Sequence, residues 1–211
     1  MSNNEERTLT FPINRSVGWV KVPKKGPDPL NNWEMLSDAT GRVFVPMETP
    51  VRLVVESSST IDLSWMQALQ PQDLSELYLV QTQVDNSQLA HVGRLTGLQK
   101  LTLSHTYENI SDSGVASLQS LLQLRELYLN ATNVSDTGLS YLQGLGHLEV
   151  LSLGATHISD VGLPYLYDLP SLRIISFDTA YSGARKSNIT PTGLSLLQKA
   201  LPNCKLITDS N

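Results

Sequence analysis

The sequence is poor in several features that mark common functional classes. It has one cysteine, Cys204, so an intramolecular disulfide is impossible. Charged residues make up 17% of the chain, and a net charge of −5 without a long Lys/Arg cluster argues against nucleic-acid binding. The N-terminus is polar, and no apolar run reaches the roughly 20 residues that span a bilayer. We therefore expect a cytoplasmic protein with no nucleic-acid and no membrane partner.

The sequence also has little that suggests catalysis. The four histidines have no metal-ligand spacing, and neither a phosphate-binding glycine-rich loop nor a Gly-x-Ser-x-Gly motif is present. Cys204 stands where the repeat described below has leucine, so we expect it to be buried and unreactive. We predict no catalytic residue, no metal site and no cofactor, and hence a protein that is not an enzyme.

What the sequence does have is a repeated phrase, Leu-x-x-Leu-x-Leu-x-x-Thr, followed by an apolar segment. Its last leucine-like position recurs in steps of about 24 residues, at Leu79, Leu103, Leu129, Leu153 and Phe177. This period is typical of leucine-rich repeats. It predicts an α/β fold, a solenoid with a parallel concave sheet and convex helices.

Each repeat predicts its own elements. In residues 124–129 leucines alternate, which predicts a short strand, and in residues 134–145 the apolar spacing changes to three, which predicts a helix. Ser111, Ser135 and Ser159 are expected to cap these helices, with an aspartate following each in the first turn. A stacked calcium column is the alternative role for the aspartates. Threonine after each strand is expected to bond to backbone groups of the turn.

The chain divides into two predicted parts. Residues 1–50 do not repeat; short alternating runs at residues 8–12, 17–22 and 41–46 predict a small β-rich N-terminal cap that contains Trp19 and Trp33. An aromatic ligand site in this cap is the alternative. Residues 51–211 form the predicted solenoid, with an irregular first repeat at 51–73 and further repeats starting at 74, 98, 124, 148 and 172.

The segment from Leu148 to Leu163 resembles the cysteine-containing class of leucine-rich repeats found in ubiquitin-ligase substrate adaptors. It is still more similar to short intracellular bacterial repeat proteins in which threonine replaces the cysteine after the strand. The terminal segment from Ala200 to Leu206 is similar to the end of such bacterial arrays. The resemblance covers about residues 51–207, implies a protein-binding scaffold, and carries no catalytic residue.

Candidate binding residues are those that the repeat leaves free. They flank the inward leucines of the strands or lie in two insertions, near residues 107–108 and within 180–188, on the rim after the strands. Tyrosine is favoured because it is enriched at interface hot spots. The predicted partner-binding residues are Glu76, Tyr78, Lys100, Thr102, His105, Tyr107, Glu126, Tyr128, Asn130, Asp178, Tyr181, Arg185 and Lys186.

These residues lead to a non-enzymatic scaffold that binds a protein of unknown identity through the concave face and the insertion rim. A solvated sheet face with exposed cross-strand ion pairs is the alternative for Glu76, Lys100 and Glu126. We expect a monomer, although the last strand, about 205–207, could pair with another chain through its free edge. A structural, self-associating module and a ubiquitin-ligase-like adaptor are the alternative functions.

Overall fold

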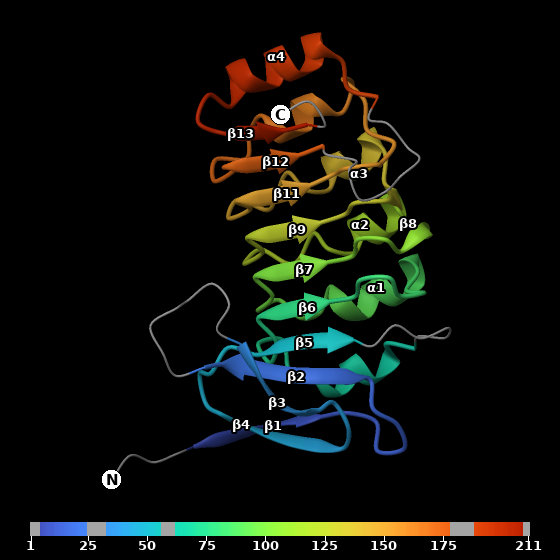
Figure 1. Ribbon diagram of the computed structural model, residues 1–211, viewed down its shortest axis with the longest axis vertical. Helices are drawn as coiled ribbons and strands as arrows, with labels where there is room; N and C mark the ends of the chain where they lie inside the picture. Colours follow the sequence, from blue (N-terminus) through green and yellow to red (C-terminus); the bar gives the residue numbers. More distant parts are fainter. Residues whose placement is uncertain (1–4, 25–32, 56–61, 178–187, 209–211) are drawn as a thin grey trace.

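The computed structural model describes residues 5–24, 33–55, 62–177 and 188–208, which stack along one long axis (Figure 1). The main sheet has nine strands. In spatial order they are β13 (Lys205–Ile207), β12 (Ile174–Ser176), β11 (Val150–Ser152), β9 (Glu126–Tyr128), β7 (Lys100–Thr102), β6 (Glu76–Tyr78), β5 (Arg52–Val55), β2 (Gly18–Pro23) and β3 (Trp33–Asp38).

Strands β5 to β13 are all parallel, and the repeat period sets their register. Leu77 of β6 pairs with Leu101 of β7, which pairs with Leu127 of β9. Each of these strands is only three or four residues long, and its central inward residue is leucine, or isoleucine in β12; this residue is fully buried in β5 to β12 and partly buried in β13. The prediction of a large parallel sheet in a mixed α/β fold is confirmed.

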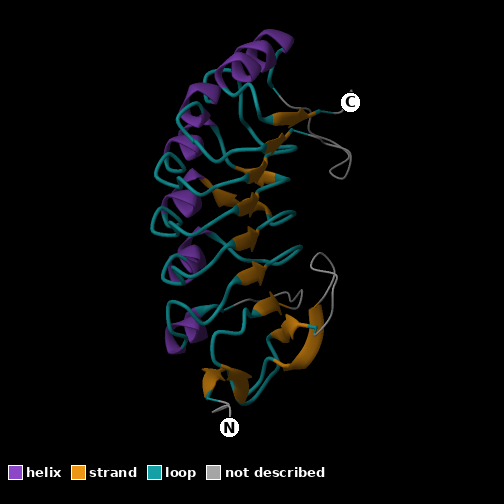
Figure 2. Cartoon of the chain, turned by 90° about the vertical axis from the view of Figure 1, so that its left-hand side faces the viewer, coloured by secondary structure: helices purple, strands orange, loops and turns teal. Residues whose placement is uncertain are grey.

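The helical elements lie on the side of the sheet that the leucines face (Figure 2). They are η1 (Ser64–Ala68), α1 (Asn86–Val92), α2 (Asp112–Ala116), α3 (Asp136–Ser140), η2 (Leu163–Leu166) and α4 (Pro191–Ala200). A short parallel pair, β8 (Tyr107–Ser111) and β10 (Thr132–Asn133), lies beside them. No helix in the described part of the chain is long and apolar enough to cross a membrane.

The helices are shorter than the sequence predicted. Residues 134–145 were expected to form one helix, but α3 ends at Ser140. Beyond it, the N–H of Leu142, Leu145 and Leu148 each donates to the carbonyl three residues earlier, at 2.9–3.0 Å. These are 3₁₀-type bonds with three residues per turn, so a leucine at every third position stays on the buried side. The spacing of three therefore signals successive tight turns rather than an α-helix.

The predicted role of the serines was wrong at Ser111 and Ser135, whose side chains make no cap bond to their own helices. Instead, Ser135 donates its N–H and its hydroxyl to the carboxylate of Asp112 in the preceding repeat, at 2.7 and 2.6 Å. Ser159 does the same to Asp136, and Thr190 to Asp160. The aspartates therefore tie neighbouring repeats together. Thr190 in addition caps α4 as expected, by accepting from the N–H of Gly193.

The threonines after the strands act as predicted. Thr82, Thr106, Thr132 and Thr156 are buried, and each donates its hydroxyl to the carbonyl of the leucine three residues before it, at 2.7–3.0 Å. A carbonyl that the turn would leave unpaired in the core is thereby satisfied.

The N-terminal strands form two groups. The antiparallel pair of β1 (Glu6–Thr10) and β4 (Arg42–Pro46) stands apart from the main sheet, whereas β2 pairs antiparallel with β5 and β3 with β2. Strands near 8–12, 17–22 and 41–46 were predicted; β3 was not. Its burial shows no clean alternation, because it is an end strand of the sheet with most side chains exposed.

Candidate functional site

The side chains of the main sheet that point away from the core form what we call the open sheet face. In β6, β9 and β12 the outer residues are half-buried around a buried central residue. The face is lined, from β5 to β12, by Arg52, Val54, Glu76, Tyr78, Lys100, Thr102, Glu126, Tyr128, Val150, Ser152, Ile174 and Ser176.

Aromatic rings and cations alternate along this face. The Arg52 guanidinium lies 4.2 Å from the centre of the Trp33 ring and 4.9 Å from that of Tyr78. The Lys100 ammonium lies 5.8 Å from the centre of the Tyr78 ring and 5.1 Å from that of Tyr128. These distances are within the range of cation–π attraction. We call the series Trp33, Arg52, Tyr78, Lys100 and Tyr128 the aromatic–cation ladder.

Two glutamates each bond to one cation and one tyrosine of the ladder. Glu76 Oε2 accepts from Arg52 Nε at 2.7 Å and from the Tyr78 hydroxyl at 3.1 Å. Glu126 Oε2 lies 2.6 Å from Lys100 Nζ and accepts from the Tyr128 hydroxyl at 2.8 Å. The charged side chains are 17–35% exposed, so the ion pairs are partly desolvated rather than fully exposed. The hydroxyls of both tyrosines are therefore bonded within the protein itself.

The surroundings keep the ladder in one charge state. Partial burial, together with the bond to Glu126, raises the pKa of Tyr128 to about 12, and burial beside Glu76 raises the pKa of Tyr78. Burial alone would lower the pKa of Lys100, but the bond to Glu126 and the two tyrosines outweigh it, and the pKa is raised. At neutral pH both phenols are protonated and Lys100 is charged.

Two further residues that were predicted to bind a partner, Thr102 and Asn130, are respectively buried and bonded to the next repeat. Thr102 pairs in register with both Tyr78 and Tyr128; it is buried, and its hydroxyl has no hydrogen-bond partner among the described residues. Asn130 bridges repeats, because its Oδ1 accepts from Ser152 Oγ at 2.9 Å and from the N–H of Gly154 at 2.8 Å. Both lie beside the ladder, where the sequence placed them.

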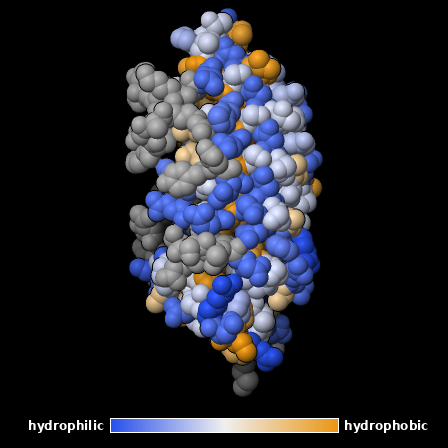
Figure 3. All heavy atoms as spheres, turned by 90° about the vertical axis from the view of Figure 1, so that its right-hand side faces the viewer, coloured by the Kyte–Doolittle hydropathy of each residue, from blue (hydrophilic) through white to orange (hydrophobic). Residues whose placement is uncertain are grey.

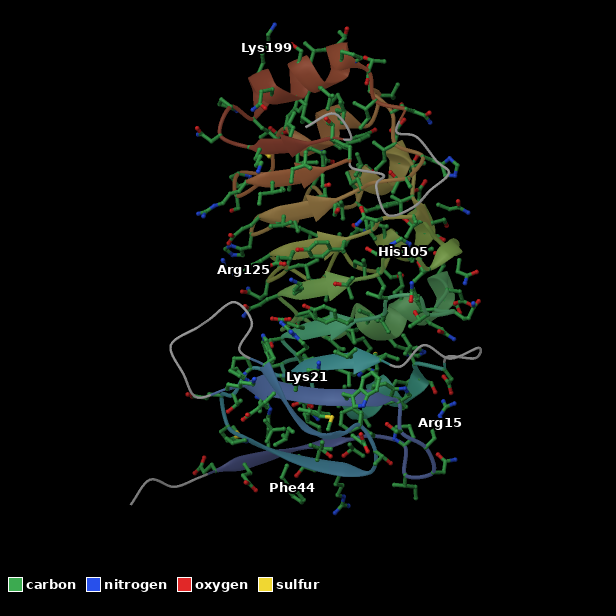
Figure 4. The ribbon with its side chains drawn as sticks, in the orientation of Figure 1. Arg15, Lys21, Phe44, His105, Arg125 and Lys199 are labelled. Atoms are coloured by element: carbon green, nitrogen blue, oxygen red, sulfur yellow. The ribbon has the colours of Figure 1, made fainter. Side chains whose placement is uncertain are left out.

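The structure describes only some of the predicted rim residues. His105 lies at the edge where the strands end, opposite Arg125 at the edge where they begin (Figure 4). Its backbone has a left-handed φ of 61°. Tyr107 starts β8, at the predicted insertion. Asp178, Tyr181, Arg185 and Lys186 lie outside the described residues. The visible part of this rim is mostly hydrophilic (Figure 3).

Sequence reasoning missed two members of the ladder. Arg52 lies 24 residues before Glu76 and pairs with it in register, so the charge series Arg52, Glu76, Lys100, Glu126 alternates along one row. Continuing that row backwards by one repeat would have revealed it. Trp33 was considered only as part of the cap, and its position over Arg52 depends on β3, which the sequence pattern did not predict.

Two other candidates for chemistry are a metal site and the thiol of Cys204. No group of three or more His, Cys, Asp or Glu side chains within the described ranges could hold a metal ion. Cys204 is buried, as expected, and burial raises the pKa of its thiol above the usual value. The main feature of the open sheet face is thus the pair of tyrosines whose hydroxyls are bonded to Glu76 and Glu126.

No family model matches the sequence, and no curated protein matches it. Solved structures do. Internalin C2 of Listeria monocytogenes is 21% identical with a TM-score of 0.54, over 82% of this chain and 78% of that one. Internalin F of the same bacterium is 18% identical with a TM-score of 0.51, over 74% of this chain and 46% of that one. The protein has a leucine-rich-repeat-like fold. The predicted fold is confirmed at this level, and the cysteine-containing class stays a prediction.

Proposed function

We propose that the protein is a non-enzymatic scaffold that binds a protein partner through the open sheet face, as the concave side of a solenoid, and through the rim that carries His105 and Tyr107. The observation that supports this most directly is the aromatic–cation ladder. Tyr78 and Tyr128 are half-buried rings whose hydroxyls are already bonded. Rings fixed in advance lose little conformational entropy when a partner covers them.

The test is a double variant, Tyr78→Ala with Tyr128→Ala, in affinity capture from the native host followed by mass spectrometry. We expect it to keep its circular-dichroism spectrum and to lose the partner that the native protein captures. Tyr165→Ala is the matched control, because Tyr165 is an exposed tyrosine on η2, on the helical side. If the double variant captures the same partner with the same affinity, the open sheet face is not the site.

A second candidate function is self-association through the end strand β13. In the described part of the chain β13 pairs with β12 alone, and Leu206 and Ile207 are only partly buried, unlike the fully buried inward leucines of the preceding strands. An unpaired strand edge can pair with another chain. Light scattering separates the two functions, because a monomer at high micromolar concentration contradicts self-association.

A further inference from the structure

A polar cleft of about 430 Å³ lies between the N-terminal strands and the first repeats. Its lining includes residues just before β5, the start of β6 and the residue before β7, so it lies near the edge of the sheet where these strands begin, which is the left edge in Figure 1. Trp33 and Glu76 line it; Trp33 also belongs to the aromatic–cation ladder, and Glu76 lies on the open sheet face. We call it the cap cleft; its volume is within the range of small-ligand sites.

Two arginines lie at or next to the cap cleft, and each is close to a carboxylate. Arg7 donates Nη2 to the carbonyls of Thr49 and Asp73, at 2.8 and 3.2 Å, and its Nε lies 3.9 Å from the Asp73 carboxylate. Arg52 is held between Trp33 and Tyr78 and is bonded to Glu76. Each guanidinium therefore has a carboxylate beside it, although Arg7 Nε has no hydrogen-bond partner among the described residues.

Some carboxylate oxygens that line the cleft accept no hydrogen bond among the described residues. Glu48 is an exposed carboxylate on the cleft wall and makes no ion pair within the described residues. Glu76 uses Oε2 for both of its bonds, and no bond to Oε1 is found in the same part of the chain. The amides of Gln72 and Gln99 also line the cleft. The cleft therefore carries excess negative charge beside an aromatic ring.

We propose that the cap cleft binds a guanidinium group, such as an arginine side chain. A guanidinium is planar, remains charged, presents five N–H donors and stacks on aromatic faces. Glu48 and Glu76 would accept its hydrogen bonds, and Trp33 would supply the stacking surface. The protein uses the same chemistry internally, because its own Arg52 is stacked on Trp33 and bonded to Glu76.

The cap cleft adds an arginine-binding site to the proposed scaffold. Its biological role rests on the proposed function, but its binding of a guanidinium does not. The cleft adjoins the ladder at Trp33 and Glu76, so a partner lying across the open sheet face could insert an arginine there. Binding of a small guanidinium probe can be measured on the protein alone. Failure of that measurement leaves partner capture by the tyrosines untouched, and failure of capture leaves the measurement untouched.

The experiment is a calorimetric or NMR titration of the full chain with Nα-acetyl-arginine methylamide and with the matching citrulline and lysine compounds. Citrulline has nearly the same shape as arginine without the charge. We expect the citrulline compound to bind roughly tenfold more weakly than the arginine compound, and the lysine compound to bind in between. Equal binding of arginine and citrulline compounds, or no arginine binding, overturns the proposal.

Two variants test whether the arginine compound binds in the cap cleft. Glu48→Gln should weaken binding of the arginine compound by roughly threefold or more, and Trp33→Leu should do the same. Glu34→Gln is the matched control, because Glu34 is an exposed carboxylate next to Trp33 that does not line the cleft. Loss of binding in Glu34→Gln, or full binding in Glu48→Gln with an unchanged melting temperature, overturns the assignment.

A peptide arm distinguishes the source of the guanidinium. An acetylated pentapeptide with one arginine between glycines is titrated beside the arginine compound. Tighter binding of the peptide supports an arginine within a chain, and equal binding supports a free guanidinium compound as sufficient. Both results support the cleft chemistry, and absence of binding by either probe contradicts it.

Discussion

At the scale of single residues, the threonine after each strand shows how one hydroxyl supports a repeat. Thr132 is fully buried and donates to the Leu129 carbonyl at 2.7 Å. Thr132→Val keeps the shape but leaves that carbonyl without a partner, so we expect a loss of about 1–3 kcal/mol in the free energy of unfolding. Urea denaturation measures it. Thr132→Ser, which retains the hydroxyl, should cost less; the hydrogen bond is unimportant if serine and valine variants prove equal.

The turns that follow β6, β7, β9 and β11 each hold a non-glycine residue in the left-handed region, at Gln81, His105, Ala131 and Ala155, with φ of 54–61°. Glycine adopts this conformation without a steric cost, although it is more flexible when unfolded. We expect Ala131→Gly to leave the free energy of unfolding unchanged or raised by up to about 1 kcal/mol. Ala90→Gly, within α1, is the control and should lower it by about 1 kcal/mol. Equal losses in both variants would contradict the strain argument.

At the scale of elements, the contact between successive repeats depends on glycine. A Cβ on Gly162 would lie 2.4 Å from Asp136 Oδ1, the group that binds Ser159. We therefore expect Gly162→Ala to lower the free energy of unfolding by about 1–3 kcal/mol, measured by urea denaturation. Gly144→Ala is the matched control, because nothing lies within 4 Å of its Cβ position. Comparable losses in the two variants would mean that the aspartate contact is not responsible.

The same elements show what the sequence could and could not reveal. Leucine spacing was enough to predict the parallel strands, since one inward leucine per strand decides both register and burial. The partner of each aspartate was not predictable, because an N-cap explains Ser-Asp locally and only the stacking distance brings Asp112 to Ser135. The free positions of Tyr78 and Tyr128 made them candidates from the sequence alone, whereas Trp33 could be added only once the fold showed it next to Arg52.

The ladder across β6, β7 and β9 makes a prediction about pH. The pKa of Tyr128 is raised to about 12 in the folded state, so the folded protein keeps the phenolic proton more tightly than the unfolded chain, whose value is near 10. This stabilisation is complete below pH 10 and is lost as the pH rises towards 12. Because the ring is half-exposed, we expect a contribution of no more than about 1–2 kcal/mol.

Urea denaturation from pH 9 to 12 tests this. Tyr128→Phe removes the titrating group and should flatten part of the decline, while Tyr165→Phe, on the opposite side of the molecule, should not. An identical pH dependence in native protein and Tyr128→Phe would show that the ladder does not hold the proton.

At the scale of the whole molecule, β2 and β3 share the main sheet with the repeats, and the N-terminal strands and the repeats share one hydrophobic core. Val20 of β2 pairs with Leu53 of β5, both are fully buried, and Arg7 of β1 bonds to Asp73 next to the first regular strand. Residues on both sides of position 50 therefore lose their packing together. We expect a single calorimetric unfolding transition, which Val20→Ala and Leu151→Ala both shift to lower temperature.

Arrays of repeats can unfold in parts when the interfaces between neighbours are weak, so this result is not automatic. In the fragment 51–211 the fully buried Leu53 and the edge of β5 would be exposed to water. Its apolar end should promote aggregation, which light scattering detects, and it should melt below the full chain. Two separate transitions in the full chain, of which Val20→Ala shifts only one, would instead show that the N-terminal strands fold independently and merely adjoin the repeats.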